Sequence, residues 1–311
     1  MIKLANKFIF INILFKIVHT YRVTFSIMIF IETGDIYVDL KSIEAGEAIM
    51  KKFILLITTF VILFPMALVL LLSVFSYYRY PLLFPDKFTL EFWKNTMLGS
   101  SRFYTSVLSS VFIGALNGIL ATLVGIMAAR AFTKYNFFGD KFIKTISSLP
   151  LFIPSIALFM GVHLMMIKLH LINSFTGVIL AHMLVCVPYA TNIFISFFNG
   201  INPDIENVAK TMGCNQTRIY SKILLPLLAP GIYLSFSIGF LISFSEYFST
   251  FLIGGGRVQT LSSLLYPYIS SGNTGNAAVL GVIFILVNIS VFFIADLLSR
   301  KKNKIDNYLF E

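Results

Sequence analysis

The sequence predicts an all-α integral membrane protein, and three observations support that prediction. Hydrophobic residues make up 57% of the 311-residue chain. Charged residues make up only 12%, against roughly 25% in soluble domains. The mean hydropathy is +0.85, and the apolar residues gather in long runs, as membrane-spanning helices require.

Six runs are long enough to cross a bilayer as helices: 53–76, 105–129, 145–167, 175–198, 224–248 and 277–298. Each holds roughly 22–25 residues, and about 20 helical residues cross a hydrocarbon core of about 30 Å. Prolines within or near these runs are tolerated where neighbouring helices satisfy the freed carbonyls. We therefore expect a six-helix transmembrane domain over residues 50–311.

The distribution of basic residues predicts the orientation of these spans. With the start of the first span inside, Lys51, Lys52 and the stretches 130–144, 199–223 and 299–311 lie in the cytoplasm. Together they carry thirteen Lys or Arg residues, whereas the opposite side carries six. The positive-inside rule then places both termini in the cytoplasm of a multi-pass protein of the cell (inner) membrane.

Residues 1–49 do not fit the six-span scheme. The apolar stretch 8–31 is interrupted by Lys16, His19 and Arg22, and a central Lys or Arg costs about 2.5–3.5 kcal/mol on insertion. At Met50 an uninterrupted span begins afresh. The leader could be an interfacial helix, an extra span or an over-extended reading frame. We favour the last, in which 1–49 is not part of the functional protein.

Several motifs that would indicate catalysis are missing from the sequence. Gly254-Gly255-Gly256-Arg257 lacks the spacing and the ending of a P-loop, and no zinc-protease, C-x-x-C or G-x-S-x-G pattern occurs. The four histidines are dispersed, and we expect His163 and His182 to make interhelical hydrogen bonds. Scattered basic residues argue against nucleic-acid binding. The sequence therefore predicts a chain with no cofactor, no metal and no enzymatic activity.

A polar stretch at 202–226 predicts a helical hairpin on the cytoplasmic side. Asn202 and Pro203 suit a helix start, and Gly213 suits its end, because a left-handed turn is easiest at glycine. Four apolar residues share one face at helical spacing: Ile205, Val208, Ala209 and Met212. Such an amphipathic helix is suited to docking into a groove of another protein.

The same stretch resembles the EAA loop of binding-protein-dependent ABC importer permeases. Asn207-Val208-Ala209 stands at the E-A-A triplet, Gly213 at the glycine, Ile223 at the isoleucine and Leu225-Pro226 at the final pair. Two of the three triplet positions depart from the pattern, and we expect Glu206, directly before it, to supply the acidic group.

The resemblance extends over about 50–300, including 128–142 and 243–269, and is strongest to the branch that carries spermidine and putrescine, iron or thiamine. It implies a six-span type I importer permease fold with a cytoplasmic coupling loop at 203–222. It also implies partners: an identical or related permease, a cytoplasmic ABC ATPase dimer that hydrolyses ATP, an extracytoplasmic solute-binding protein and membrane lipid. The coupling residues would be Glu206, Asn207, Val208, Ala209, Gly213, Ile223, Leu225 and Pro226.

Glu246, near the outer end of the fifth span, is a candidate residue of the solute path. An acid within a membrane segment indicates function unless a partner satisfies it. Glu246 could line the path and favour a small cation such as a polyamine, or it could pair with Arg257 or a neighbouring helix end. Two other functions stay open at this stage, an ion-driven secondary carrier and a non-transporting membrane scaffold.

Overall fold

A computed structural model describes residues 40–75, 87–99, 101–135 and 138–309. Their regular structure is helical, and one isolated bridge pairs Phe75 with Phe88. The helices are α2 (Leu40–Val74), α3 (Glu91–Leu98), α4 (Ser101–Lys134), α5 (Asp140–Ser148), η1 (Leu149–Leu151), α6 (Ser155–Lys168), α7 (Phe175–Gly200), α8 (Asp204–Thr211), α9 (Gln216–Ile219), η2 (Tyr220–Leu224), α10 (Leu225–Ser245), α11 (Phe248–Gly254), α12 (Leu261–Ser270) and α13 (Thr274–Leu309).

The described residues divide into two units, one up to Pro65 and one from Met66 onward. The predicted leader, 1–49, falls largely on residues 1–39, which lie outside the described part. Within that part, α2 begins at Leu40 and continues past Met50 without a break. The domain boundary at residue 50 therefore stays a prediction, and it does not coincide with a helix end.

Among the described residues, five helical segments are long and apolar enough to cross a membrane: Phe53–Val74, Ser101–Lys134, Phe175–Gly200, Gln216–Ser245 and Thr274–Ala295. They correspond to five of the six predicted runs. Within this part of the chain the bent pair Asp140–Leu151 and Ser155–Lys168 gives a sixth span if it is counted as one.

The third predicted run, 145–167, is not one continuous helix, because α5 and η1 meet α6 at a bend of 106°. Pro150 and Pro154 stand four residues apart at this break. Pro154 has no N–H to give to the carbonyl of residue 150, and its ring would clash with that carbonyl in a continuous helix. The helix restarts at Ser155, and α6 packs against α11.

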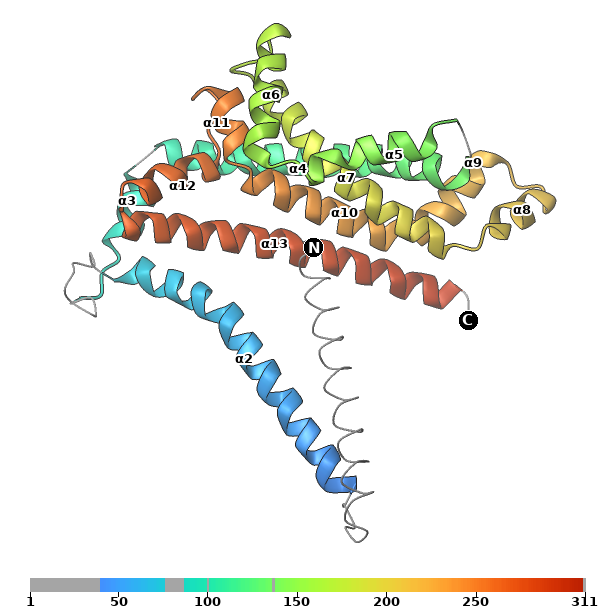
Figure 1. Cartoon of the computed structure of the whole chain (residues 1–311), viewed down its shortest axis with the longest axis horizontal. Helices are drawn as coiled ribbons and strands as arrows, with labels where there is room; N and C mark the ends of the chain where they lie inside the picture. The colour runs from blue at the N-terminus through green and yellow to red at the C-terminus, as the bar shows by residue number, and fades with distance from the viewer. Residues whose placement is uncertain (1–39, 76–86, 100, 136–137, 310–311) are drawn as a thin grey trace, which may run out of the picture. The chain divides into compact units, whose positions relative to one another are not determined.

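Helices α4, α7 and α10 pack against one another and form the centre of the 66–311 unit, with α13 beside α10 (Figure 1). Small residues allow close contact. A Cβ added to Gly239 of α10 would lie 3.1 Å from the Cα of Gly118 on α4, and one added to Gly125 would lie 2.6 Å from the Cβ of Ala190 on α7. Such contacts favour helix association in lipid, where no hydrophobic force drives it.

Polar side chains link the same helices. Thr122 of α4 donates to Ser235 of α10 at 3.0 Å. His182 of α7 is buried and bonds Ser243 at 2.8 Å and Thr250 of α11 at 3.1 Å, which confirms the predicted interhelical bonds of this histidine. The Nδ1 of His163 is buried without a hydrogen-bond partner among the described residues, so the structure gives no support to the same prediction at this atom.

Candidate functional site

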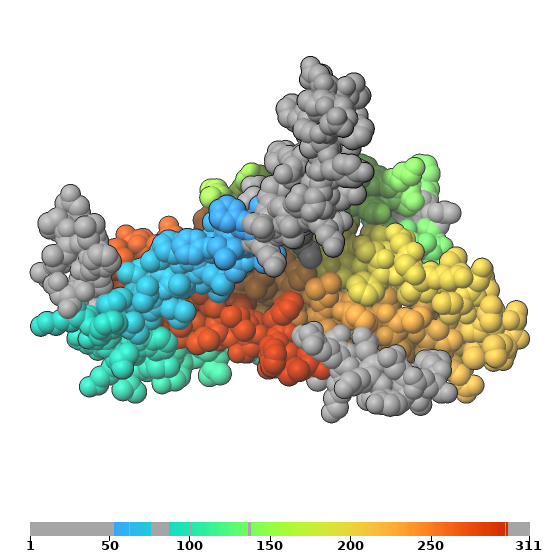
Figure 2. Space-filling model, turned by 90° about the horizontal axis from the view of Figure 1, so that it is seen from below, coloured from blue at the N-terminus to red at the C-terminus, as the bar shows by residue number. Residues whose placement is uncertain are grey.

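The stretch 202–226 forms a hairpin of two short helices, α8 and α9, between the long helices α7 and α10. It lies at one end of the 66–311 unit, while α3, α11 and α12 lie toward the other end (Figure 1). In the space-filling view the same segment, coloured yellow, forms the surface of that end (Figure 2). The two short helices of the predicted hairpin are confirmed, and its cytoplasmic side stays a prediction.

The first helix of the hairpin is fixed locally at both ends. The side-chain oxygen of Asn202 accepts from the N–H of Asp204 at 2.9 Å, as predicted for a cap. At the other end Gly213 has φ +81°. The N–H of Gly213 bonds the carbonyl of Lys210 at 2.9 Å, and that of Cys214 bonds the carbonyl of Ala209 at 3.0 Å. These two bonds form a Schellman motif, which explains the need for glycine.

The second half of the hairpin joins directly to α10. Asn215 caps α9 through the N–H of Arg218 at 2.9 Å. The turn Tyr220–Leu224 then widens into a π-helix. Pro226, in the first turn of α10, has no N–H to give to the carbonyl of Lys222, and this loss allows the wider turn. The sequence analysis did not predict this π turn.

The apolar residues of α8 do not share one environment, contrary to the single face that the spacing predicts. Ala209 is buried against Ile219 and Leu224, with Ile223 partly buried beside them. Val208 is 55% exposed and Met212 is 79% exposed. Thus one side of α8 holds the hairpin together, and the other side is open. Asn207 and Leu225 are exposed, and Pro226 is half-buried.

Glu206 lies on the inner side of α8 and pairs with two cations of α4. Arg130 Nη2 donates to Glu206 Oε1, and Lys134 Nζ donates to Oε2. The Glu206 side chain is only 10% exposed. Burial alone would raise the pKa of this carboxyl, but the hydrogen bonds from Lys134 and Arg130 and their charges hold the pKa below its ordinary value. Glu206 therefore faces its own chain.

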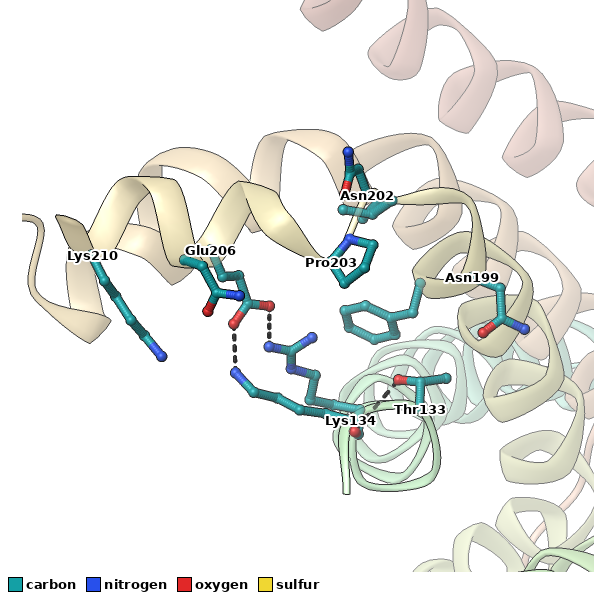
Figure 3. A pocket seen from close by; sticks show the side chains of 11 residues that line it. Thr133, Lys134, Asn199, Asn202, Pro203, Glu206 and Lys210 are labelled. Carbon is teal, nitrogen blue, oxygen red and sulfur yellow. Dashed lines mark hydrogen bonds and ion pairs between the residues drawn. The ribbon is translucent and has the colours of Figure 1, made fainter. Parts of the chain in front are cut away.

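Arg130 and Lys134 are site residues that the sequence analysis did not single out. Both lie in the stretch 128–142 that resembles the importer permeases, but their pairing requires α4 and α8 to meet across 76 residues of chain. A cleft of about 450 Å³ opens beside the ion pairs, lined also by Asn199, Asn202 and Lys210. Figure 3 shows Lys210 extending from α8 in the same direction as Glu206.

Glu246 lies one residue beyond α10, at the end of that helix remote from α8 (Figure 1). Its carboxylate accepts from the N–H of Ser249 in the first turn of α11 at 3.3 Å. Its carbonyl accepts from the hydroxyls of Thr250 and Ser262. Of the two local partners considered, the geometry favours a neighbouring helix end. The ion pairs of the described residues do not join Glu246 to Arg257.

Metal binding finds no support in the part of the chain that is described. No three His, Cys, Asp or Glu side chains come together there. The described side chains of the hairpin region supply helix packing, two ion pairs and an exposed apolar edge.

Comparison with known proteins assigns the family. The family model described as binding-protein-dependent transport system inner membrane component matches residues 121–304. The spermidine/putrescine transport system permease protein PotC of Haemophilus influenzae is 24% identical over 211 residues, covering 68% of this chain and 82% of that protein. A protein of Salmonella typhi named as the 2-aminoethylphosphonate transport permease PhnV is 24% identical over 239 residues, covering 76% and 89%.

Two solved structures show the same fold. The bacterial ABC transporter that imports alginate matches with a TM-score of 0.65 and 17% identity, covering 84% of this chain and 98% of that chain. The MetNI methionine ABC transporter matches with a TM-score of 0.51 and 14% identity, covering 66% and 98%. Because the family match spans more than half of the chain, the chain belongs to the binding-protein-dependent inner membrane components, the multi-pass permease subunits of ABC importers, which leave ATP hydrolysis to a separate subunit.

Proposed function

We propose that this permease imports a small organic cation, an aliphatic amine such as a polyamine, and that its α8–α9 hairpin couples the import to a cytoplasmic ATPase dimer. The observation that carries the coupling part is the hairpin itself. It is rigidly capped, it lies at one end of the 66–311 unit, and it presents Val208 and Met212 to solvent. An exposed apolar edge on a short helix suits a groove on a partner.

The transport cycle would be alternating access between two global states. ATP binding closes the ATPase dimer, which displaces the hairpin and opens the path toward a solute-loaded binding protein. Hydrolysis then resets the path inward. This cycle needs different contacts of the hairpin in the two states, since only a differential contact shifts a conformational equilibrium. Asn207, Val208 and Met212 would touch the ATPase.

The proposed assembly contains a second permease, identical or related, and an extracytoplasmic binding protein. A solved relative supports the latter, because the alginate transporter has been seen in complex with a solute-bound periplasmic protein. In the proposed orientation both termini of this chain are cytoplasmic, since thirteen of the Lys and Arg residues near the spans then lie inside and six outside.

The solute class is supported by the relatives and by one charge. Spermidine and putrescine, named for one relative, are aliphatic polyamines and cations at neutral pH. The 2-aminoethylphosphonate named for the other relative shares the aliphatic amine but also carries an anionic phosphonate, so the cation assignment rests on the first relative. Glu246 lies half-buried at the end of the bundle that would face the binding protein. One carboxylate oxygen accepts from Ser249, so the group retains acceptor capacity for an ammonium group.

The test is uptake by the complete transporter, with both permeases, the ATPase and the binding protein reconstituted in proteoliposomes. We expect labelled putrescine to accumulate, and Glu246→Gln to reduce accumulation with assembly intact. Glu91→Gln, an exposed carboxylate of α3, is the matched control and should not change uptake. A solute that proves anionic, or full uptake by Glu246→Gln, contradicts the cation assignment and leaves Glu246 only as an acceptor for the first turn of α11.

A further inference from the structure

Arg130 joins three helical elements to α4 at a single point. Its guanidinium donates to Glu206 of α8, lies 5.3 Å from the ring centre of Phe198 of α7, and lies 5.8 Å from that of Tyr220 in η2. Both rings are within the range of cation–π attraction. The guanidinium is therefore held from several sides, and its position on α4 is coupled to the hairpin.

Lys134 reinforces the same connection from the next turn of α4. Residues four apart lie on one face of a helix, so Arg130 and Lys134 approach Glu206 together and each takes one carboxylate oxygen. The exposed fractions are 14% for the Arg130 side chain and 27% for that of Lys134. The carboxylate is almost fully withdrawn from water and depends on these two partners (Figure 3).

Apolar contacts hold α8 to its own hairpin rather than to α4. Ala209 packs against Ile219 and Leu224, the buried residues of a small cluster that α4 does not enter. The contact between α8 and α4 is therefore carried by charge. An ionic contact of this kind can pass a displacement of α8 to α4 although the two helices share no large apolar interface.

We propose that Glu206, Arg130 and Lys134 form an ionic tether that transfers a displacement of α8 to α4, and that Glu206 makes no contact with the ATPase. The proposal rests on the proposed coupling function of the hairpin. α4 packs on both α7 and α10, through the close contacts at Gly118 and Gly125, so movement of its end moves the packed core. The exposed Val208 and Met212 bind the partner, and the buried Glu206 conveys the motion.

Glu206→Gln tests the tether, because it keeps the size of the side chain and removes its charge. In the reconstituted transporter we expect ATPase association to persist. Hydrolysis stimulated by the loaded binding protein, and uptake with it, should fall by about fivefold or more, the range of an ordinary coupling free energy. Asp204→Asn makes the same chemical change at an exposed position of α8 and should leave stimulation and uptake at the wild-type level.

Exchanging the charges of Arg130 and Glu206 distinguishes an ionic tether from a carboxylate that only stabilises the fold. Arg130→Glu alone should uncouple, and Arg130→Glu combined with Glu206→Arg should recover much of the stimulated hydrolysis. Unchanged uptake by Glu206→Gln, loss of ATPase association in Glu206→Gln, or no recovery in a folded double variant overturns the tether. A wild-type complex that shows no ATP-dependent uptake instead overturns the proposed function itself.

Discussion

Gly213 is the residue of the hairpin turn whose backbone has a positive φ. A Cβ added there would meet nothing within 4 Å, so the cost of a side chain comes from φ +81° alone. For a β-branched residue this cost is about 1–2 kcal/mol. We expect Gly213→Val to insert in the membrane yet to lose ATPase association or transport-linked hydrolysis.

Gly200 provides the matched control for this substitution. It lies at the end of α7, also with nothing within 4 Å of an added Cβ, but without a positive φ. Gly200→Val should therefore keep normal coupling. If Gly213→Val binds the ATPase and transports at the wild-type rate, the assignment of the hairpin turn to coupling is wrong.

The ionisation of Glu206 predicts a pH dependence of stability. Its pKa in the folded protein lies below the ordinary 4.5, so its ion pairs stabilise fully above that pH and are lost as pH falls through the folded pKa. At neutral pH Glu206→Gln should lower the free energy of unfolding by about 1–3 kcal/mol, since both cations still reach some solvent. The difference in melting temperature from wild type should shrink under acid conditions; a difference that grows there contradicts the ion pairs.

At the scale of elements, the two sides of α8 predict different reactivity. In a background with Cys186 and Cys214 replaced, Met212→Cys should react with a water-soluble thiol reagent in the free permease, because Met212 is 79% exposed. Addition of the ATPase should slow this reaction at least about tenfold if the edge docks in a groove. Ala209→Cys, on the buried side, should react slowly in both states. Equal labelling of Met212→Cys with and without the ATPase would contradict the proposal that this side of α8 docks on the ATPase.

The hairpin and the third span show what the sequence can and cannot predict at this scale. The hairpin was predictable because its determinants are local: Asn202 accepts from a residue two positions on, and Gly213 closes a turn within five residues. The break of 106° before α6 was not, because Pro150 and Pro154 are compatible with either a kinked span or a broken one. Their surroundings decide between the two.

The ion pairs of Glu206 were beyond sequence analysis for a different reason. Arg130 and Glu206 are 76 positions apart, and only the packing of α4 against α7 brings them together. The resemblance to the E-A-A triplet directed attention to Glu206 as an outward contact, whereas the structure turns it inward. Asn207, Val208 and Ala209 were correctly placed in a helix, but spacing alone did not divide them between a buried and an exposed side.

At the scale of the whole molecule, the prediction that residues 1–49 are not needed for function can be tested directly. We expect deletion of 1–49, with translation from Met50, to preserve membrane level and uptake, because the uninterrupted first span begins there. Expression of the two chains in a strain lacking the native permease compares them directly. A strong loss of either membrane level or uptake would show that the leader is a working element.

The energy source of uptake is the most direct test of whether ATP drives import through this permease. Proteoliposomes with the complete transporter are supplied with labelled solute, with ATP on the cytoplasmic side and solute-binding protein on the other. We predict uptake that requires both ATP and the binding protein and that a protonophore does not reduce. Uptake by this permease under an ion gradient without ATP would identify a secondary carrier, and absence of uptake from a fully assembled complex with each candidate solute would identify a scaffold. Either result contradicts coupling through α8.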